Sequence, residues 1–242
     1  MSRIFVNQPL IVQSTVTVTG DDCHYLTHVL RLHIGEKVFL FNGGALEFEA
    51  TLQKIDSKKI VFSINQAWPV SKESPIEISI AQGIPKANKM DDLIPKLTEL
   101  GALKLIPLMT ERSQVKSISP HKLDRWKKIA KVSAQQTGRT RLMEIETPET
   151  LERLLEKHAS FEKFFFYELE LSEGFKPALK KCTAKQYLCI IGPEGGFTQP
   201  EVSLAKASHC HVVSLGQRIL RTETVAPALT AIIQFEKGDL SL

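Results

Sequence analysis

Short apolar segments alternate with helix-like segments through residues 76–236, and this alternation restricts the fold more than any other feature. The helix-like segments separate five strand-like runs, which are Ile76–Ala81, Leu103–Met109, Lys163–Tyr167, Tyr187–Ile191 and His211–Leu215. Strands that alternate with helices form a mainly parallel sheet covered by those helices. The sequence therefore predicts an α/β domain over residues 71–242.

The first 70 residues have a different pattern, with several short segments rich in β-forming residues. Asn42-Gly43-Gly44 stands between two of them and is typical of a hairpin turn. One helix is expected to be capped by Asp21 or Asp22 and to run to Arg31. Strands are expected at Arg3–Val6, Thr15–Thr19, Lys37–Asn42, Leu46–Leu52 and Lys59–Asn65. So many short strands indicate a small β-barrel over residues 1–70, and the proline-containing segment Pro69–Pro75 is expected to act as a linker.

Several helices are expected after the linker. Lys89–Leu100 places apolar side chains on one face, and Pro95 within it predicts a kink or a late helix start. A basic helix is expected at His121–Gln136. Thr147 is expected to cap a shorter helix with Pro148 at its first position, and a last helix is expected at Thr224–Glu236.

The composition is typical of a globular protein of the cytoplasm. Hydrophobic residues make up 43% of the sequence, without an apolar run long enough to span a membrane or the pattern of a secretory signal. The cysteines have no metal-like spacing, and His24 and His28, one helical turn apart, lack an evident third ligand. We therefore expect no membrane partner, no metal, and reduced thiols at Cys23, Cys182, Cys189 and Cys210.

The charge distribution is more informative than the net charge of +4. Residues 112–141 hold 9 basic residues and 1 acidic residue, whereas residues 1–70 hold 6 of each. A concentration of this kind creates a positive potential suited to a phosphate backbone. The alternative is a solvated helix face with spare lysines, and charge alone leaves both open.

Two glycine-containing segments follow strand-like runs near the C-terminus. Ile191 leads into Gly192-Pro193-Glu194-Gly195-Gly196, after which Thr198 and Glu201 have the spacing of a helix capping box. Ser214 leads into LGQRILRTET at residues 215–224. Ligands of open α/β sheets bind outside the carboxyl ends of strands, where glycine lets the backbone approach a ligand. Tight structural turns are the alternative, which two such loops in one domain make less favoured.

These segments together resemble the RsmE family of 16S ribosomal RNA (uracil-N3)-methyltransferases, within the SPOUT superfamily. The resemblance extends along the whole chain, and GPEGG followed by Glu201, then LGQRILRTET, are its most specific parts. Weaker matches are Arg3-Ile4-Phe5, His24 with Val29-Leu30-Arg31, Lys89-Met90-Asp91, Lys96–Gly101, Glu111-Arg112-Ser113 and the QxGR element ending at Arg139. The chain departs from the family pattern at Gln135, Val225 and Pro95.

The resemblance implies a small PUA-like β-barrel followed by an α/β methyltransferase domain with a deep trefoil knot. It also implies a homodimer that uses S-adenosylmethionine to methylate N3 of a uridine in the decoding region of 16S rRNA, within the assembled small ribosomal subunit. Loops at Phe166–Leu171, Gly192–Gly196 and Leu215–Thr224 would surround the cofactor. The implied cofactor-binding residues are Ile191, Gly192, Pro193, Glu194, Gly195, Gly196, Leu215, Gly216, Ile219, Leu220 and Thr224. The implied RNA-binding residues are Arg3, His24, Arg31, Lys89, Arg112, Arg139 and Arg141.

Methylation at uracil N3 requires loss of the proton on that nitrogen, so a nearby cation is expected to stabilise the developing anion. Arg221 is the leading candidate because it lies inside the second loop. Glu223 or Thr222 is expected to position the base or accept the proton.

The sequence leaves three alternatives open. An RNA-binding module without catalysis would leave the two glycine loops without a purpose. A dinucleotide oxidoreductase would need its glycine fingerprint after the first strand of the domain, whereas these glycines come late. A SPOUT enzyme that methylates a ribose 2′-hydroxyl would share the same cofactor loops.

Overall fold

The computed structural model describes residues 1–56, 58–70, 72–170 and 172–241, and the chain divides into two compact units. Unit 1 consists of Met1–Glu73 and Ala134–Leu142, and unit 2 consists of Ser74–Ser133 and Met143–Leu242. The grouping of 134–142 with unit 1 differs from the predicted division at residue 70.

The segment Ala134–Leu142 belongs to unit 1 because polar groups near the N-terminus bind it. The Arg3 guanidinium donates to the carbonyl oxygens of Ala134 and Arg139, at 3.3 and 3.1 Å. The Phe5 amide donates to Gln135 Oε1 at 3.0 Å. These bonds join residues more than 120 positions apart, so no local pattern in the sequence announces them.

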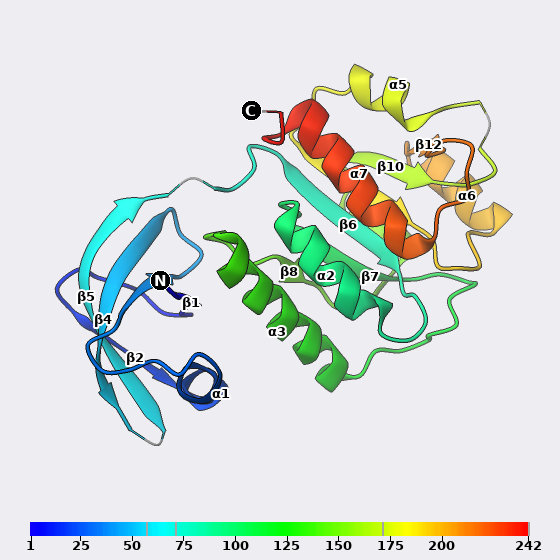
Figure 1. The fold of residues 1–242 in the computed structure, drawn as a ribbon. Coiled ribbons are helices and arrows are strands. Elements are labelled where there is room, and N and C mark those ends of the chain that lie inside the picture. The colour runs from blue at the N-terminus through cyan, green and yellow to red at the C-terminus, as the bar shows by residue number, and fades with distance from the viewer. Residues whose placement is uncertain (57, 71, 171, 242) are drawn as a thin grey trace. The chain divides into compact units, whose positions relative to one another are not determined.

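Unit 1 is built on a five-stranded sheet (Figure 1). In spatial order its strands are β1 (Arg3–Phe5), β3 (Lys37–Phe41), β4 (Leu46–Ile55), β5 (Lys59–Pro69) and β2 (Thr15–Thr19). Alternate side chains such as Val38, Leu40, Ile60 and Phe62 are fully buried in its core. The five predicted strands are present, but β5 continues to Pro69, so the predicted linker begins inside a strand. Ser71 of that linker lies outside the described residues.

The helical segment of unit 1 begins earlier than predicted, because its N-cap is Thr19 and not Asp21 or Asp22, which lie in its first turn. The α-helix α1 (Gly20–His24) continues as a single π-helical segment, η1 (Tyr25–Val29). Arg31 has a φ of 53°, in the left-handed region, so the helix cannot extend to that residue as predicted.

Unit 2 contains a seven-stranded sheet whose described neighbouring strands pair in parallel. The order is β12-β10-β11-β6-β7-β8, and β9 also pairs with β7. The strands are β6 (Glu77–Gly83), β7 (Lys104–Met109), β8 (Glu144–Ile145), β9 (Glu149–Thr150), β10 (Glu162–Phe166), β11 (Gln186–Ile191) and β12 (His211–Val213). The prediction of an α/β domain with a parallel sheet is confirmed.

Helices cover both faces of this sheet because each central strand is apolar on both sides. Along β10, Phe164 and Phe166 belong to the core under α2, α5 and α7, whereas Phe165 belongs to the core under α4 and α6. Figure 1 shows α2 and α7 side by side on the first of these faces. The helices are α2 (Lys89–Glu99), α3 (Pro120–Thr137), α4 (Leu151–Lys157), α5 (Phe175–Lys181), α6 (Gln199–Ala207) and α7 (Thr222–Lys237).

Three predicted helix boundaries need correction. The helix α2 begins at Lys89 with Pro95 inside it, so the proline does not delay its start. Thr147 does not cap α4, because Glu149 and Thr150 extend to pair with β7 and Thr150 becomes the N-cap. The helix α7 begins at Thr222, two residues before its predicted start. Among the helices of the described ranges we find none with the length and hydrophobicity to span a bilayer.

Candidate active site

A cavity of about 590 Å³ lies where the strands β10, β11 and β12 end. Its walls come from the segments that follow these strands, Phe166–Glu168, Ile191–Glu194 with Gly196, and Ser214–Glu223. Lys89 at the start of α2 and Val225 of α7 complete the lining. The carboxyl ends of parallel strands meet at one edge of a sheet, which is where such folds bind ligands. The structure thus brings the two glycine-containing loops to a single cavity.

Thr222 joins these two loops through its hydroxyl group. Its Oγ1 donates to the carbonyl oxygen of Gly192 at 2.7 Å and accepts from Gln82 Nε2 at 2.8 Å. Gln82 is fully buried at the end of β6 and also donates to the carbonyl oxygen of Gly83. Gln82 is not among the predicted site residues, and its only signal in the sequence is that of a polar side chain directly after the apolar run Ile76–Ala81.

Backbone contact without side chains fixes the first loop against β6. A Cβ atom at Gly83 would lie 2.3 Å from the backbone nitrogen of Pro193, so only glycine permits this approach. Gly196, at the end of the same loop, has a φ of 65°, a conformation that glycine adopts without strain. The loop between these points is therefore held by its backbone shape.

The capping box predicted after the first loop is present. The Glu201 amide donates to Thr198 Oγ1, and the Thr198 amide donates to Glu201 Oε2 at 2.7 Å. The other carboxylate oxygen of Glu201 accepts from the Glu111 amide at 2.9 Å, and Arg112 donates to the Gly195 carbonyl at 3.0 Å. Glu201 therefore begins α6 and also fixes the segment after β7 beside the loop.

Lys89 forms two ion pairs at the mouth of the cavity. Its Nζ lies 3.2 Å from Glu223 Oε2 and 3.3 Å from Glu194 Oε1. The hydrogen bond to Glu223, followed by that to Glu194, raises the pKa of Lys89. A backbone amide, followed by Lys89, lowers the pKa of Glu223. Both groups are therefore charged at neutral pH, and Glu223 is an ionised carboxylate with little basicity.

The predicted cofactor and catalytic residues are concentrated at this cavity. Arg221, Thr222 and Glu223 line it. So do the predicted cofactor residues Ile191, Gly192, Pro193, Glu194, Gly196, Leu215, Gly216, Ile219 and Leu220. Of the predicted residues that the structure describes, Gly195 and Thr224 lie outside this lining. Leu171, at the end of the predicted loop Phe166–Leu171, lies outside the described residues.

The predicted RNA-binding residues are divided between the two units. Lys89 and Arg112 belong to unit 2 and have the contacts given above. In unit 1 the exposed residues of this group are His24, Arg31 and Arg141.

Arg3 and Arg139 differ from that group because both hold unit 1 together. Arg3 Nε donates to Glu47 Oε1 at 2.6 Å. Arg139 is only 4% exposed and its Nη2 donates to Glu73 Oε2 at 2.8 Å. Their guanidinium groups thus have structural partners, and contact of either with RNA stays a prediction.

The cavity has the size and chemistry of a small-molecule site, for which volumes of roughly 300–1,000 Å³ are usual. Phe166, Ile191 and Leu215 supply apolar surface, and Glu168 and Glu194 supply carboxylates. Lys89, Arg218 and Arg221 in the same lining balance the carboxylates. This combination of apolar and charged groups suits an amphipathic ligand.

Comparisons with known proteins extend over both units. Residues 72–234 match the family model of an RNA methyltransferase domain, and residues 18–65 match that of an RNA methyltransferase PUA domain. The ribosomal RNA small subunit methyltransferase E of Bacillus subtilis is 32% identical, over 96% of this chain and 96% of the relative. The protein of the same name from Synechocystis is 33% identical, over 96% of this chain and 76% of the relative.

Solved structures agree with these similarities. A putative methyltransferase from Legionella pneumophila, in complex with its cofactor SAM, has a TM-score of 0.90 at 30% identity, over 98% of both chains. The ribosomal RNA small subunit methyltransferase E of Neisseria gonorrhoeae, bound to S-adenosyl methionine, has a TM-score of 0.89 at 28% identity, over 99% of both chains.

Proposed function

This chain belongs to the ribosomal RNA small subunit methyltransferase E family, and from that premise we propose that it methylates N3 of a uridine in the decoding region of 16S rRNA. Family membership supports an S-adenosylmethionine-dependent rRNA methyltransferase. The nitrogen, the decoding region and the assembled small subunit as substrate are our proposal. The observation that supports this function is the hydrogen bond from the Thr222 hydroxyl to the Gly192 carbonyl, which holds the two predicted loops around one cavity.

The cavity lining fits S-adenosylmethionine, which supplies an electrophilic methyl group on a sulfonium centre when bound. Ile191, Gly192, Leu215, Ile219 and Leu220 would hold the adenine and methionine portions through their backbone groups. Apolar surroundings exclude water, and fixed loops orient the reacting groups, which lowers the barrier to transfer.

We assign different roles to the three predicted catalytic residues. Arg221 is exposed at the cavity and would stabilise the anion that develops on the uracil oxygens as N3 loses its proton. The Thr222 hydroxyl already donates to Gly192, so Thr222 acts as a positioning residue. Glu223 holds Lys89 at the cavity mouth and is a weak proton acceptor, because its pKa is lowered.

The role of Arg221 is tested by comparing Arg221→Ala with Arg153→Ala, an exposed arginine on α4. We expect Arg221→Ala to lower single-turnover methylation by at least 10-fold while calorimetry shows unchanged affinity for S-adenosylmethionine. Arg153→Ala should leave both quantities unchanged. Wild-type turnover in Arg221→Ala would exclude Arg221 from the chemical step.

The target atom is tested by nuclease digestion of methylated RNA and mass spectrometry of the released nucleosides. N3-methyluridine is the expected product, and a 2′-O-methylated nucleoside would favour the alternative SPOUT reaction. The same assay on small subunits and on protein-free 16S rRNA separates the two substrate states, with methylation of the subunits expected. A target base in either state must leave its stack to reach the cavity.

We propose that residues 1–70 act as a PUA-like RNA-binding domain and residues 71–242 as the methyltransferase domain. The basic stretch at 112–141 supports RNA binding through phosphates, so affinity should fall steeply with salt concentration. A salt-insensitive complex would contradict this assignment. We further propose that the methyltransferase domain contains a deep trefoil knot, a rare exception to ordinary chain connectivity, and that the protein works in the cytoplasm.

A homodimer is also part of this proposal. Ile232 and Phe235 of α7 and Leu240 beyond it are 37%, 60% and 50% exposed. They lie beside a second cavity of about 940 Å³, which shares Ser214–Gln217 with the first. Clustered exposed apolar side chains are typical of protein interfaces. Light scattering during gel filtration should give the mass of two chains, and Phe235→Glu should shift it towards one.

A further inference from the structure

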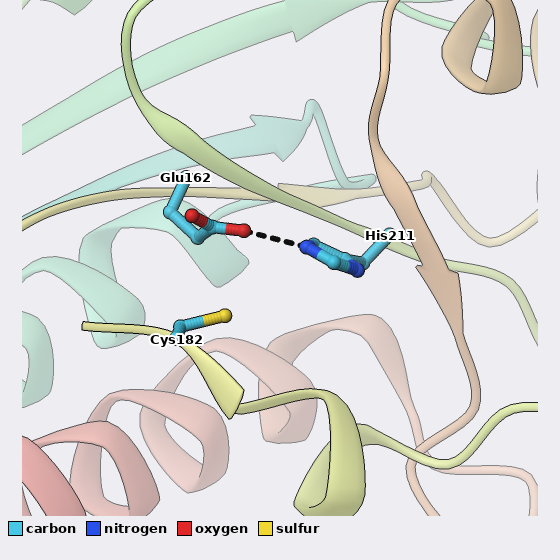
Figure 2. Close-up of side chains that lie close together, drawn as sticks. All are labelled: Glu162, Cys182 and His211. Carbon is cyan, nitrogen blue, oxygen red and sulfur yellow. Dashed lines mark hydrogen bonds and ion pairs between the residues drawn. The ribbon is translucent and has the colours of Figure 1, made fainter. Parts of the chain in front are cut away.

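Three side chains with different donor atoms converge at the edge of the unit 2 sheet (Figure 2). Glu162 begins β10, His211 begins β12, and Cys182 follows α5. One oxygen, one nitrogen and the sulfur all lie within 4.8 Å of one another. The cluster lies at the amino ends of β10 and β12, whereas the proposed active site follows their carboxyl ends, so it belongs to a different part of the unit.

The donor set is that of a transition-metal site. A thiolate, an imidazole and a carboxylate are the groups that zinc takes from proteins, with a water at the fourth position of an open site. We propose that Glu162, Cys182 and His211 form a binding site for a zinc ion. Each of the three supplies one ligand atom, and the ion joins β10, the end of α5 and β12.

The distances are compatible with this coordination. Glu162 Oε1 lies 2.5 Å from His211 Nε2, and Cys182 Sγ donates to the Ala178 carbonyl at 3.3 Å. Zinc bonds of about 2.0–2.3 Å place tetrahedral ligand atoms roughly 3.3–3.7 Å apart. Shifts of about 1 Å by side chains are therefore enough, with the oxygen and nitrogen moving apart and the sulfur moving closer.

A buried tyrosine gives a second and independent observation. Tyr187 is fully buried, and its hydroxyl group has no hydrogen-bond partner among the described residues. Tyr187 belongs to the same buried core cluster as Cys182. A buried hydroxyl without a partner is costly. We expect a water bound to the ion to accept a hydrogen bond from this hydroxyl.

An ion can reach the cluster from solvent. The side chains of Glu162 and His211 are 28% and 34% exposed, whereas Cys182 is 6% exposed. The ring of Phe164 stacks on His211 with centroids 5.2 Å apart and so restrains the imidazole. The Lys237 ammonium donates to the backbone carbonyl oxygen of Cys182 at 2.8 Å and not to its sulfur, so the sulfur can still bind the ion.

The Cys182 thiol must lose its proton when zinc binds. The Cys182 sulfur donates a hydrogen bond to the Ala178 carbonyl, so it carries a proton in the metal-free chain. When zinc binds, the S–H bond breaks, the S–Zn bond forms and the proton goes to solvent. His211 then binds as the neutral imidazole through Nε2, with its proton on Nδ1.

The test uses the full chain without a histidine tag, freed of metal with a chelator and titrated with Zn²⁺ or Co²⁺. We expect one ion per chain by native mass spectrometry and a higher Tm with zinc. Cobalt should give a thiolate-to-metal charge-transfer band in the near ultraviolet. Cys182→Ser should lose that band and at least 10-fold in zinc affinity, whereas Cys210→Ser, which changes a cysteine outside the cluster, should keep both.

A second variant keeps the proposal testable if Cys182→Ser does not fold. Glu162→Gln preserves the side-chain shape and should keep the cobalt band while losing at least 10-fold in zinc affinity. The proposal is overturned if the wild-type chain binds no zinc at micromolar concentrations, if cobalt binds without the band, or if Glu162→Gln binds zinc as the wild type does.

Discussion

Replacement of Gly83 by alanine tests whether backbone contact between β6 and the first loop shapes the cofactor cavity. The added Cβ would lie 2.3 Å from the Pro193 nitrogen and 2.6 Å from the Gly192 carbonyl carbon, whereas ordinary contact begins near 3.4 Å. Both atoms belong to the backbone, so the loop must move by about 1 Å to relieve the overlap. A displacement of this size costs about 100-fold in the rate of a well-oriented reaction.

The stability of the variant should fall as well. Overpacking a well-packed interior costs about 1–3 kcal/mol, and each kcal/mol lowers Tm by about 2–4 °C in a chain of this size. Gly174→Ala is the matched control, because its Cβ would meet Pro177 Cδ at 3.6 Å and the φ of −93° suits alanine. Calorimetry with S-adenosylmethionine, single-turnover methylation and thermal unfolding measure the three effects.

The result that would refute this reasoning is wild-type behaviour of Gly83→Ala. If the variant binds S-adenosylmethionine, methylates and unfolds as the control does, the first loop is free to adapt, and the close contact at Pro193 does not determine the cavity. If Gly83→Ala lowers the Tm but leaves the affinity for S-adenosylmethionine unchanged, the contact stabilises β6 without shaping the cofactor cavity.

The remaining predictions concern hydrogen bonds and charge. Thr222→Val removes both hydrogen bonds of the Thr222 hydroxyl, to Gly192 and from Gln82. This change should lower the unfolding free energy by about 2–4 kcal/mol and weaken S-adenosylmethionine binding. Unchanged values in both assays would refute the positioning role. Lys89→Met removes the ion pairs to Glu194 and Glu223 and should lower RNA affinity or turnover. Kinetics equal to those of the wild type would argue against a role of Lys89. Burial raises the pKa of Glu146, but its ion pairs with Lys157 and Lys104 outweigh burial and lower that pKa below the ordinary value of 4.5. The ionised carboxylate therefore stabilises the folded chain fully above pH 4.5, and this contribution is lost as the pH falls through the lowered pKa. Glu146→Gln should therefore show a smaller loss of Tm between neutral and acid pH than the wild type, and parallel curves would contradict this.

The zinc proposal and the methyltransferase proposal can fail separately. The cluster lies at the amino ends of β10 and β12, away from the cofactor cavity, so Cys182→Ser is expected to retain cofactor binding in the folded chain. Arg221→Ala, in turn, should leave zinc affinity unchanged. An effect of one variant in the other assay would show that the two edges of the sheet are energetically coupled.

The succession of short apolar runs and helix-like segments predicts much of the fold, because it is local information. Side chains of a strand alternate between two faces, so runs such as Tyr187–Ile191 predict strands buried on both sides. The glycine loops were likewise recognisable because they directly follow these strands. Helix boundaries do not follow from local patterns alone. The predicted cap at Thr147 is wrong because pairing of Glu149 and Thr150 with β7 decides where α4 begins.

Only the tertiary structure decided which distant residues meet. Gln82 and Thr222 are 140 positions apart, yet one hydrogen bond joins them behind the cavity. Glu162, Cys182 and His211 have no metal-like spacing, and the order of β10, α5 and β12 around the sheet brings their donor atoms together. A sequence pattern reports neighbours along the chain, whereas a site depends on the packing of whole elements, because side chains from separate elements must converge within a few ångströms.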